Sequence, residues 1–392
     1  MPAVRIRFLD LSAQYAVLAD EVRAAVDAVL ASQAFVLGPA VGRFEEALAR
    51  YLGVPAVVGV ASGTDALYLA LRALDIGPGD AVVTTPFSFV ATATSIARTG
   101  ARPYFVDIDA DSFNLDPRAV ARWIEHECRR EGEVLRAPDG ERLRAILPTH
   151  LFGRVCDMAA FTRLADEAEL DLVEDAAQAI GARTDDGRAA GALGQFGCVS
   201  FYPTKNLGGA GDGGAVVCRR EVDAGLVRML ARHGTDGGPY RHVEFGLASR
   251  LDALQAAVLG VKLPRLDAWN QARRAHAARY EERLAATFGT SGPVRGPGVV
   301  AGHVYHQYVV RVPERDRVRA ALAAEGIETQ VYYPIPLHLQ PCFVGLGYAR
   351  GDLPEAERAS REVLALPIYP ELPAHVPDAV VAALASALGA RP

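Results

Sequence analysis

The segment VPAVVGVASGTDALYLALRAL, residues 54–74, passes directly from a strand pattern into a helix pattern. It begins with a short apolar run of the kind found in buried strands, whereas ALYLALRAL at 66–74 has the spacing of an amphipathic helix. The turn ASGTDAL at 61–67 supplies a serine that can cap the helix and an aspartate three residues later. This unit predicts an α/β fold for the surrounding chain.

The alternation of strand and helix patterns continues along the chain as far as about residue 232. Amphipathic stretches such as 157–169 separate apolar runs of strand length. The further candidate strands lie at 81–86, 102–108, 144–153, 170–177, 197–203 and 213–218. We therefore predict a mostly parallel central sheet with helices on both faces, in which ligands bind at the carboxyl ends of the strands.

The C-terminal third of the chain has a different organisation. Residues 250–286 have the pattern of a long helix that is interrupted near Pro264. HVYHQYVVRV at 303–312 indicates a strand, and DRVRAALAAEG at 316–326 indicates a helix.

These patterns predict two domains. We expect residues 1–249, including an N-terminal arm, to form a large α/β domain, and residues 250–392 to form linking helices and a smaller α+β domain. The polar segment 126–143 contains APDG, which predicts an exposed loop insertion.

The composition excludes several classes of protein. The 41 basic and 47 acidic residues give a net charge of −6, which argues against a general affinity for nucleic acid. The five cysteines are scattered and have no metal-ligand spacing, so we expect reduced thiols, no metal site and a cytoplasmic location. We find neither a secretion signal nor an apolar run long enough to span a membrane.

Lysine is almost absent from the chain. Of the 41 basic residues, 39 are arginine, and only Lys205 and Lys262 are lysine. An arginine cannot lose its proton at working pH or form a Schiff base, whereas a lysine can do both. Lys205 follows a candidate strand in SFYPTKNLGGAGDGGAVV at 200–217, although a glycine-rich hairpin with an exposed lysine also explains this segment. A lysine in such a turn can hold an aldehyde cofactor and then move a proton between carbon atoms.

Two acidic residues end the candidate strand in VEDAAQAIGA at 173–182. Because side chains alternate along a strand, Glu174 and Asp175 point to opposite faces, so one of them can enter a site. Acids that cap the next helix explain the same pattern. The functional interpretation is a carboxylate that keeps a pyridine nitrogen protonated and makes the ring an electron sink. Gln178 could then donate a hydrogen bond to the phenolic oxygen of the ring.

Two further segments suggest cofactor contacts. Gly63 and Thr64 lie at the start of the helix in ASGTDAL, where free N–H groups can hold a phosphate, although a well-capped helix accounts for the motif without a ligand. Ser200 lies before Lys205 on the same strand and could contact that phosphate. In TTPFSFVATA, Phe89 is either a core residue or a stacking partner for a flat ring.

Taken together, these segments resemble the DegT/DnrJ/StrS family of sugar aminotransferases, which have the aspartate-aminotransferase-like fold called fold type I. The resemblance covers nearly the whole chain. The segments that carry it are SGTDAL, TPFSFVATA, VDIDADSFNLDP, EDAAQAIGA, SFYPTKNLGG with GDGGAVV, RLDALQAAVL, GIETQVYYPIPLHLQP and LPIYPEL.

The resemblance implies a role for each of these residues. Lys205 would hold pyridoxal 5'-phosphate (PLP) as a Schiff base, and Asp175 would pair with the pyridine nitrogen. Gln178 would contact the ring oxygen, and Phe89 would stack on the ring. The residues that would bind the cofactor phosphate are Gly63, Thr64 and Ser200.

The family resemblance also implies a homodimer whose active sites are shared between subunits. In the family, a Gly-x-Asn-x-Arg segment sends its Asn to the cofactor phosphate of the other subunit, but Ala248 stands at that position here. Ser249 is the nearest candidate to replace it, and loss of the contact is the alternative. Arg250 is retained as a candidate for an anionic substrate group. Tyr333 and His338 lie in a segment that resembles the family's substrate loop, although packing of a proline-rich turn explains them equally well.

The function implied by the resemblance is amino transfer from L-glutamate to a keto-sugar on UDP or dTDP, for amino-sugar biosynthesis. A related dehydratase branch has His in place of the Schiff-base lysine, so Lys205 argues against it. Transamination of a cyclitol ketone stays open, because the same core chemistry serves both substrates. A non-catalytic PLP-binding regulator is the alternative from another class, against which Lys205, Asp175 and Gln178 argue together.

Overall fold

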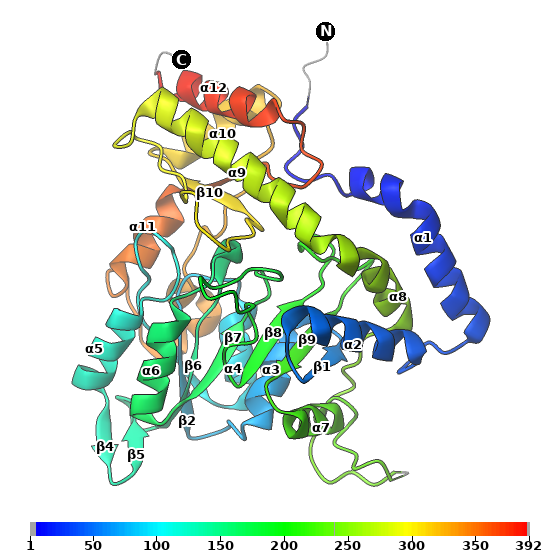
Figure 1. Ribbon diagram of the computed structural model, residues 1–392. Helices are drawn as coiled ribbons and strands as arrows, with labels where there is room; N and C mark the ends of the chain where they lie inside the picture. Colours follow the sequence, from blue (N-terminus) through cyan, green and yellow to red (C-terminus); the bar gives the residue numbers. More distant parts are fainter. Residues whose placement is uncertain (1–4, 239, 390–392) are drawn as a thin grey trace.

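A nine-stranded sheet forms the centre of the computed structural model, which describes residues 5–238 and 240–389 (Figure 1). Its strands are β1 (Ala56–Val60), β2 (Asp80–Thr84), β3 (Arg102–Phe105), β4 (Arg129–Glu131), β5 (Val134–Arg136), β6 (Arg142–Leu147), β7 (Asp171–Asp175), β8 (Phe196–Ser200) and β9 (Gly214–Cys218). The main order is β1-β9-β8-β7-β6-β2-β3. Strands β8, β7, β6, β2 and β3 are parallel, and β9 is antiparallel to both of its neighbours. The predicted, mostly parallel α/β sheet is confirmed.

Helices surround this sheet and form most of the C-terminal part. They are α1 (Leu11–Ser32), α2 (Pro39–Leu52), α3 (Gly63–Ala73), α4 (Ala91–Thr99), α5 (Pro117–Glu127), α6 (Met158–Ala168), α7 (Glu221–Leu230), α8 (Ala253–Lys262), α9 (Leu266–Phe288), α10 (Arg315–Ala324), α11 (Pro354–Glu362) and α12 (Val376–Leu388). A short 3-10 turn at Leu263–Arg265 separates α8 from α9, which confirms the predicted break. In the described part of the chain, no helix is both long enough and apolar enough to cross a membrane.

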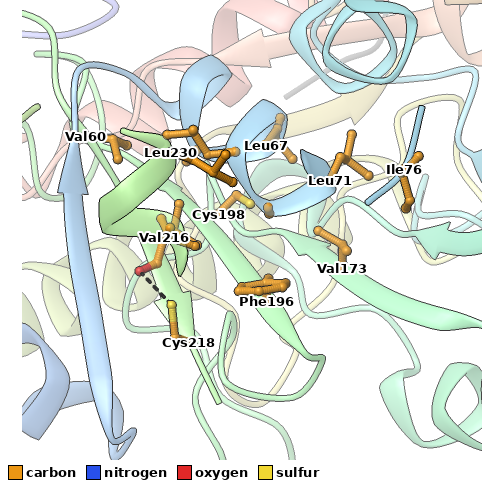
Figure 2. Packing of buried hydrophobic residues seen from close by; sticks show 14 of the residues in the cluster. Val60, Leu67, Leu71, Ile76, Val173, Phe196, Cys198, Val216, Cys218 and Leu230 are labelled. Atoms are coloured by element: carbon orange, nitrogen blue, oxygen red, sulfur yellow. Dashed lines mark hydrogen bonds between the residues drawn. The ribbon is translucent and has the colours of Figure 1, made fainter. Parts of the chain in front are cut away.

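The sheet is covered on both faces, and its strand side chains alternate between the two layers as strand geometry requires. Val58 of β1 belongs to the core beneath α3 and α7, whereas its neighbour Val57 packs with α2 and α8. Figure 2 shows Leu67 and Leu71 of α3 facing the sheet in the first of these cores. This packing fixes the position of α3, whose first residue is Gly63.

A second, two-stranded antiparallel sheet of β10 (Tyr308–Arg311) and β11 (Val363–Leu366) belongs to a separate core with α9, α10 and α12. The N-terminal arm packs against this core through Ile6 and Leu9, and Ile6 pairs with Ile327. Ile6 and Leu9 thus link the arm to the C-terminal core, and the division into residues 1–249 and 250–392 stays a prediction.

Two other expectations change. The segment 126–143 is not a simple loop, because it contains the hairpin β4–β5, with Gly132 at its turn in a left-handed conformation (φ 63°) that favours glycine. Leu135 of this hairpin is buried with α5 and α6, which gives the insertion its own anchor. The strand expected over 303–312 begins only at Tyr308.

Candidate active site

The predicted site residues follow the carboxyl ends of four strands of the central sheet, β1, β2, β7 and β8. Asp175 is the last residue of β7, and Lys205 follows the neighbouring strand β8. Phe89 lies between β2 and α4, and Gly63 begins α3. The order of the sheet therefore brings residues from distant parts of the chain to one edge, where ligands of such sheets bind.

Asp175 is a buried and well-oriented carboxylate. Its exposed fraction is 4%, Thr92 Oγ1 donates to Oδ2 at 2.7 Å, and the Ala177 backbone N–H donates to Oδ1 at 3.1 Å. Burial raises the pKa of Asp175 above its ordinary value, while these hydrogen bonds and the positive charge of Lys205 oppose the rise. A positively charged partner would therefore be held strongly at this carboxylate.

Glu174, the neighbouring acid, has a structural role. It points to the other face of β7, where three backbone N–H groups of the loop 191–194 donate to it at 2.6–2.8 Å. His150 Nδ1 accepts the N–H of Cys156, so Nε2 carries the ring proton and donates to Glu174 at 2.8 Å. With Glu174 fully engaged in this way, Asp175 is the acid that remains for chemistry.

Lys205 has the properties of a reactive amine. Burial lowers the pKa of Lys205 from 10.5 to about 8, although the negative charge of Asp175 opposes this shift. No carboxylate of the described residues lies within the 4.0 Å ion-pair distance of its Nζ atom. The amine and the acid therefore act on each other's pKa without forming a direct ion pair.

The start of α3 forms a cradle beside β8. A Cβ atom on Gly63 would lie only 2.7 Å from Cβ of Ser200, so a glycine is required for this close approach. The side chain of Ser62 caps the helix by accepting the Asp65 N–H at 3.1 Å, as the sequence predicts. The N–H groups of Gly63 and Thr64 belong to the first helical turn, which has no carbonyl partners within the helix. Together with the Ser200 hydroxyl, this geometry fits a phosphate group.

The remaining predicted cofactor contacts, Phe89 and Gln178, both lie beside Tyr333. The Phe89 side chain is 55% exposed, and its ring centre lies 6.5 Å from that of Tyr333. Gln178 accepts the Phe152 N–H through Oε1 at 2.7 Å, and its Nε2 donates to the Tyr333 hydroxyl at 3.0 Å. Phe89 thus has an exposed ring, and Gln178 has an amide held by two hydrogen bonds, as their predicted cofactor contacts require.

Two predicted residues, His338 and Ser249, are buried and make their contacts within this chain. His338 is only 1% exposed and its Nε2 lies 3.3 Å from Glu357, so its ring packs inside the protein and we assign it no substrate contact. Ser249 is fully buried, where it accepts the Ala61 N–H and donates to Asp65. Both hydrogen bonds of the Ser249 hydroxyl thus lie within its own chain, and a replacement of the family asparagine by Ser249 stays an untested prediction.

Arg250 makes no polar contact with the other described residues. It is partly buried, and the described residues form no hydrogen bond or ion pair with its guanidinium. An unengaged arginine at this position is compatible with binding an anionic group from outside the chain.

The residues that sequence reasoning missed act through contacts with the site. Thr92 orients Asp175, and it lies inside the quoted segment TTPFSFVATA, but a threonine in a helix has no distinctive pattern. His306 Nδ1 donates to Oδ1 of Asn206 at 3.1 Å, and Asn206 is the residue that follows Lys205 in the sequence. Burial, and then the positive charge of Lys205, hold the pKa of His306 well below its ordinary value.

Comparison with known proteins now adds independent information. The model of the DegT/DnrJ/EryC1/StrS aminotransferase family matches residues 17–385. A pleiotropic regulatory protein of Geobacillus stearothermophilus is 45% identical over 94% of this chain and 95% of its own length. A dTDP-3-amino-3,4,6-trideoxy-alpha-D-glucose transaminase of Streptomyces venezuelae is 44% identical over 94% of this chain and 92% of its own length. The structure of NtdA from Bacillus subtilis, with bound cofactor PMP, is 30% identical, with a TM-score of 0.86 over 99% of this chain and 85% of that chain.

The fold and the site define a PLP-dependent transferase of fold type I. The chain belongs to the DegT/DnrJ/EryC1/StrS aminotransferase family. It is an aminotransferase, and its cofactor is pyridoxal 5'-phosphate, of which PMP is the aminated form.

The lowered pKa of Lys205 predicts how cofactor attachment depends on pH. Below the pKa of about 8, the fraction of Lys205 present as the reactive free amine falls about tenfold for each unit by which the pH is lowered. The rate at which apoenzyme attaches PLP should therefore rise with pH and become constant above about pH 8. Asp175→Asn removes the charge that raises the pKa, so its plateau should begin at a lower pH. A wild-type rate that climbs steadily toward pH 10.5, the ordinary lysine value, would contradict the assignment.

Proposed function

We propose that this chain transfers an amino group from L-glutamate to a keto-sugar carried on UDP or dTDP, for amino-sugar biosynthesis. The observation that carries the proposal is that Lys205 and the buried Asp175 lie close enough for each charge to change the pKa of the other. The printed activity of the Streptomyces venezuelae relative, a dTDP-sugar transaminase, supports the substrate class.

The residues have distinct tasks in this reaction. Lys205 Nζ would hold the cofactor and, once released, would move a proton between two carbon atoms as a general base and then a general acid. Asp175, oriented by Thr92 and Ala177, would hold a proton on the pyridine nitrogen. When bound, PLP supplies a ring that accepts negative charge from the carbon that loses its proton. Phe89 would cover one face of that ring.

Substrate binding draws on fewer residues. Tyr333, held by Gln178 near Phe89, is a candidate contact for the sugar. Arg250 is a candidate for an anionic group, and the nucleotide diphosphate supplies one. A panel of UDP- and dTDP-linked 3-keto and 4-keto sugars, with L-glutamate as donor and 2-oxoglutarate as the measured product, tests the proposal directly.

The alternatives are tested by the same assay. A cyclitol ketone in the panel tests the other acceptor class. The regulatory name of the Geobacillus stearothermophilus relative keeps a non-catalytic role open. A chain that binds PLP but forms no 2-oxoglutarate with any acceptor would favour the regulator.

We also propose a homodimer in which each site is completed by the partner subunit. Two aromatic side chains of the segments that carry the predicted site residues are exposed in the single chain, Phe89 at 55% and Tyr202 at 52%. A second subunit that completes the site would cover such apolar surface. Light scattering should give twice the mass of the 41.7 kDa chain.

Mixed dimers test whether Arg250 acts across the interface. Lys205→Ala and Arg250→Ala should each be inactive alone, because every site lacks one group. After the two are mixed and allowed to exchange, half of the dimers are mixed, and one of their two sites has both residues. Activity should then return to about a quarter of the wild-type value. Absence of recovery, despite exchange detected by mass, would place Arg250 in its own subunit's site.

A further inference from the structure

The side chain of Ser249 binds both ends of the turn at residues 61–65, which leads from β1 into α3. Its exposed fraction is 0%. Its hydroxyl accepts the Ala61 N–H at 3.1 Å and donates to Asp65 Oδ2 at 2.7 Å. A hydroxyl has one proton to donate and lone pairs to accept with, so these two bonds fix its orientation. One buried group thus connects the first and the last residue of the turn.

Ser249 is itself anchored by its surroundings. Its N–H donates at 3.0 Å to the carbonyl of Ala231, the residue that follows α7. Leu251, two residues further on, is 1% exposed and belongs to the core formed with α2 and α8. The neighbouring Ala248 has no polar atom in its side chain, so it cannot share this task. The segment around Ser249 is therefore a fixed support for the turn.

The backbone of the turn also lies directly against the central sheet. A Cβ atom on Gly214 of β9 would lie 2.6 Å from the Gly63 nitrogen, and a Cβ atom on Gly63 would lie 2.7 Å from that of Ser200 on β8. Ser200 and Gly214 are paired with each other in the sheet. The turn therefore has no room to move toward the sheet, and the hydrogen bonds of Ser249 add a restraint at each of its ends.

This arrangement leaves the N–H groups of Gly63 and Thr64 available. The N–H groups of Ala61 and Asp65 are already bonded to serine oxygens. The N–H groups of Gly63 and Thr64 have no acceptor among the described residues. Free N–H groups at a helix start, where the helix dipole is positive, suit an anion such as a phosphate.

We propose that Ser249 is a positioning residue for the cofactor phosphate, because its hydroxyl holds the N–H groups of Gly63 and Thr64 in the orientation that the phosphate requires. The inference rests on the proposed function, since it takes these N–H groups and Ser200 as the phosphate site of its cofactor. Ser249 acts through the turn, without direct contact with the phosphate. A turn that is ordered before the cofactor arrives loses less conformational entropy when the phosphate binds.

The test compares PLP with pyridoxal, which has the same ring and aldehyde but no phosphate. Each is titrated into apoenzyme prepared from the purified holoenzyme, and the absorbance of the Lys205 linkage gives the Kd. Ser249→Ala should raise the Kd for PLP about tenfold, the effect of one lost hydrogen bond, and change that for pyridoxal by less than about twofold. Ser360→Ala removes another buried hydroxyl, which donates to the Glu357 carbonyl at 2.8 Å in α11, and should leave both Kd values unchanged.

The selective loss distinguishes a positioning role from a general effect on folding. Ser249→Cys keeps a side chain of similar shape but has a weak donor and acceptor, so it should show the same selectivity without leaving a cavity. Equal weakening of PLP and pyridoxal, or no change in either Kd, would overturn the inference. These titrations need no amino transfer. A selective loss, combined with a wild-type enzyme that forms no 2-oxoglutarate from L-glutamate, would therefore contradict the proposed function alone.

Discussion

Lys205→Ala is expected to abolish amino transfer, with a loss of at least about 10³-fold in kcat, because one side chain supplies both the covalent attachment and the general base. The absorbance of the covalently attached cofactor should disappear with it. PLP itself should still bind, since the cradle of Gly63, Thr64 and Ser200 is untouched. Rapid mixing with L-glutamate measures the lost step directly.

The near-absence of lysine provides a sharp control for this variant. Lys262 is the other lysine, and its Nζ donates to the carbonyl of Gly208 at 2.7 Å. Lys262→Arg keeps a donor for this carbonyl and should retain activity. Borohydride reduction followed by peptide mapping should attach the cofactor at residue 205 and leave residue 262 unlabelled. Label at Lys262, or turnover that survives Lys205→Ala, would refute the assignment.

Asp175→Ala should leave the cofactor bound and nearly inert. Breaking a buried charge pair costs about 3–5 kcal/mol, which corresponds to a loss in kcat between about 10² and 10⁴-fold. The absorbance of the Lys205 linkage should persist, since the amine remains, so this variant separates attachment of the cofactor from its chemistry.

Thr92→Val is the graded comparison for Asp175. It keeps the carboxylate but removes the 2.7 Å hydrogen bond that orients Oδ2. A hydrogen bond to a charged group is worth about 1.5–3 kcal/mol, so the effect should be smaller than that of Asp175→Ala. Activity of Asp175→Ala within a few-fold of wild type would show that the ring has a different partner.

The seven strands on the main path of the central sheet, the break at Pro264 and the capped start of α3 could be predicted because each depends on residues close together in the sequence. The alternation of side chains along β7 likewise explains why only one of its two terminal acids enters the site. Contacts between distant segments could not be predicted this way. Thr92 and Asp175 are 83 residues apart, and Ser249 and Asp65 are 184 apart. No spacing rule links such positions, because the sheet order that joins them is set by the whole fold.

His338 and the N-terminal arm illustrate the same limit. The segment around His338 resembles a substrate loop, but the Leu337 N–H donates to the carbonyl of Pro86 and residues 336–338 are buried. Polar residues in such a loop look functional in the sequence, and only the packing shows which way they point. The arm likewise lies far in sequence from Ile327, its partner in the C-terminal core.

The opposite directions of Glu174 and Asp175 make this edge of the sheet intolerant of changes in chain length. Loss of one residue in the turn before β7, with the strand shifted to compensate, would exchange the two side chains between faces. The longer glutamate would then lie on the face of the site, and the loop 191–194 would face the shorter aspartate, whose carboxylate would be displaced from the N–H groups that now bind Glu174. Such a deletion would damage catalysis and folding together, although it removes neither acid from the protein.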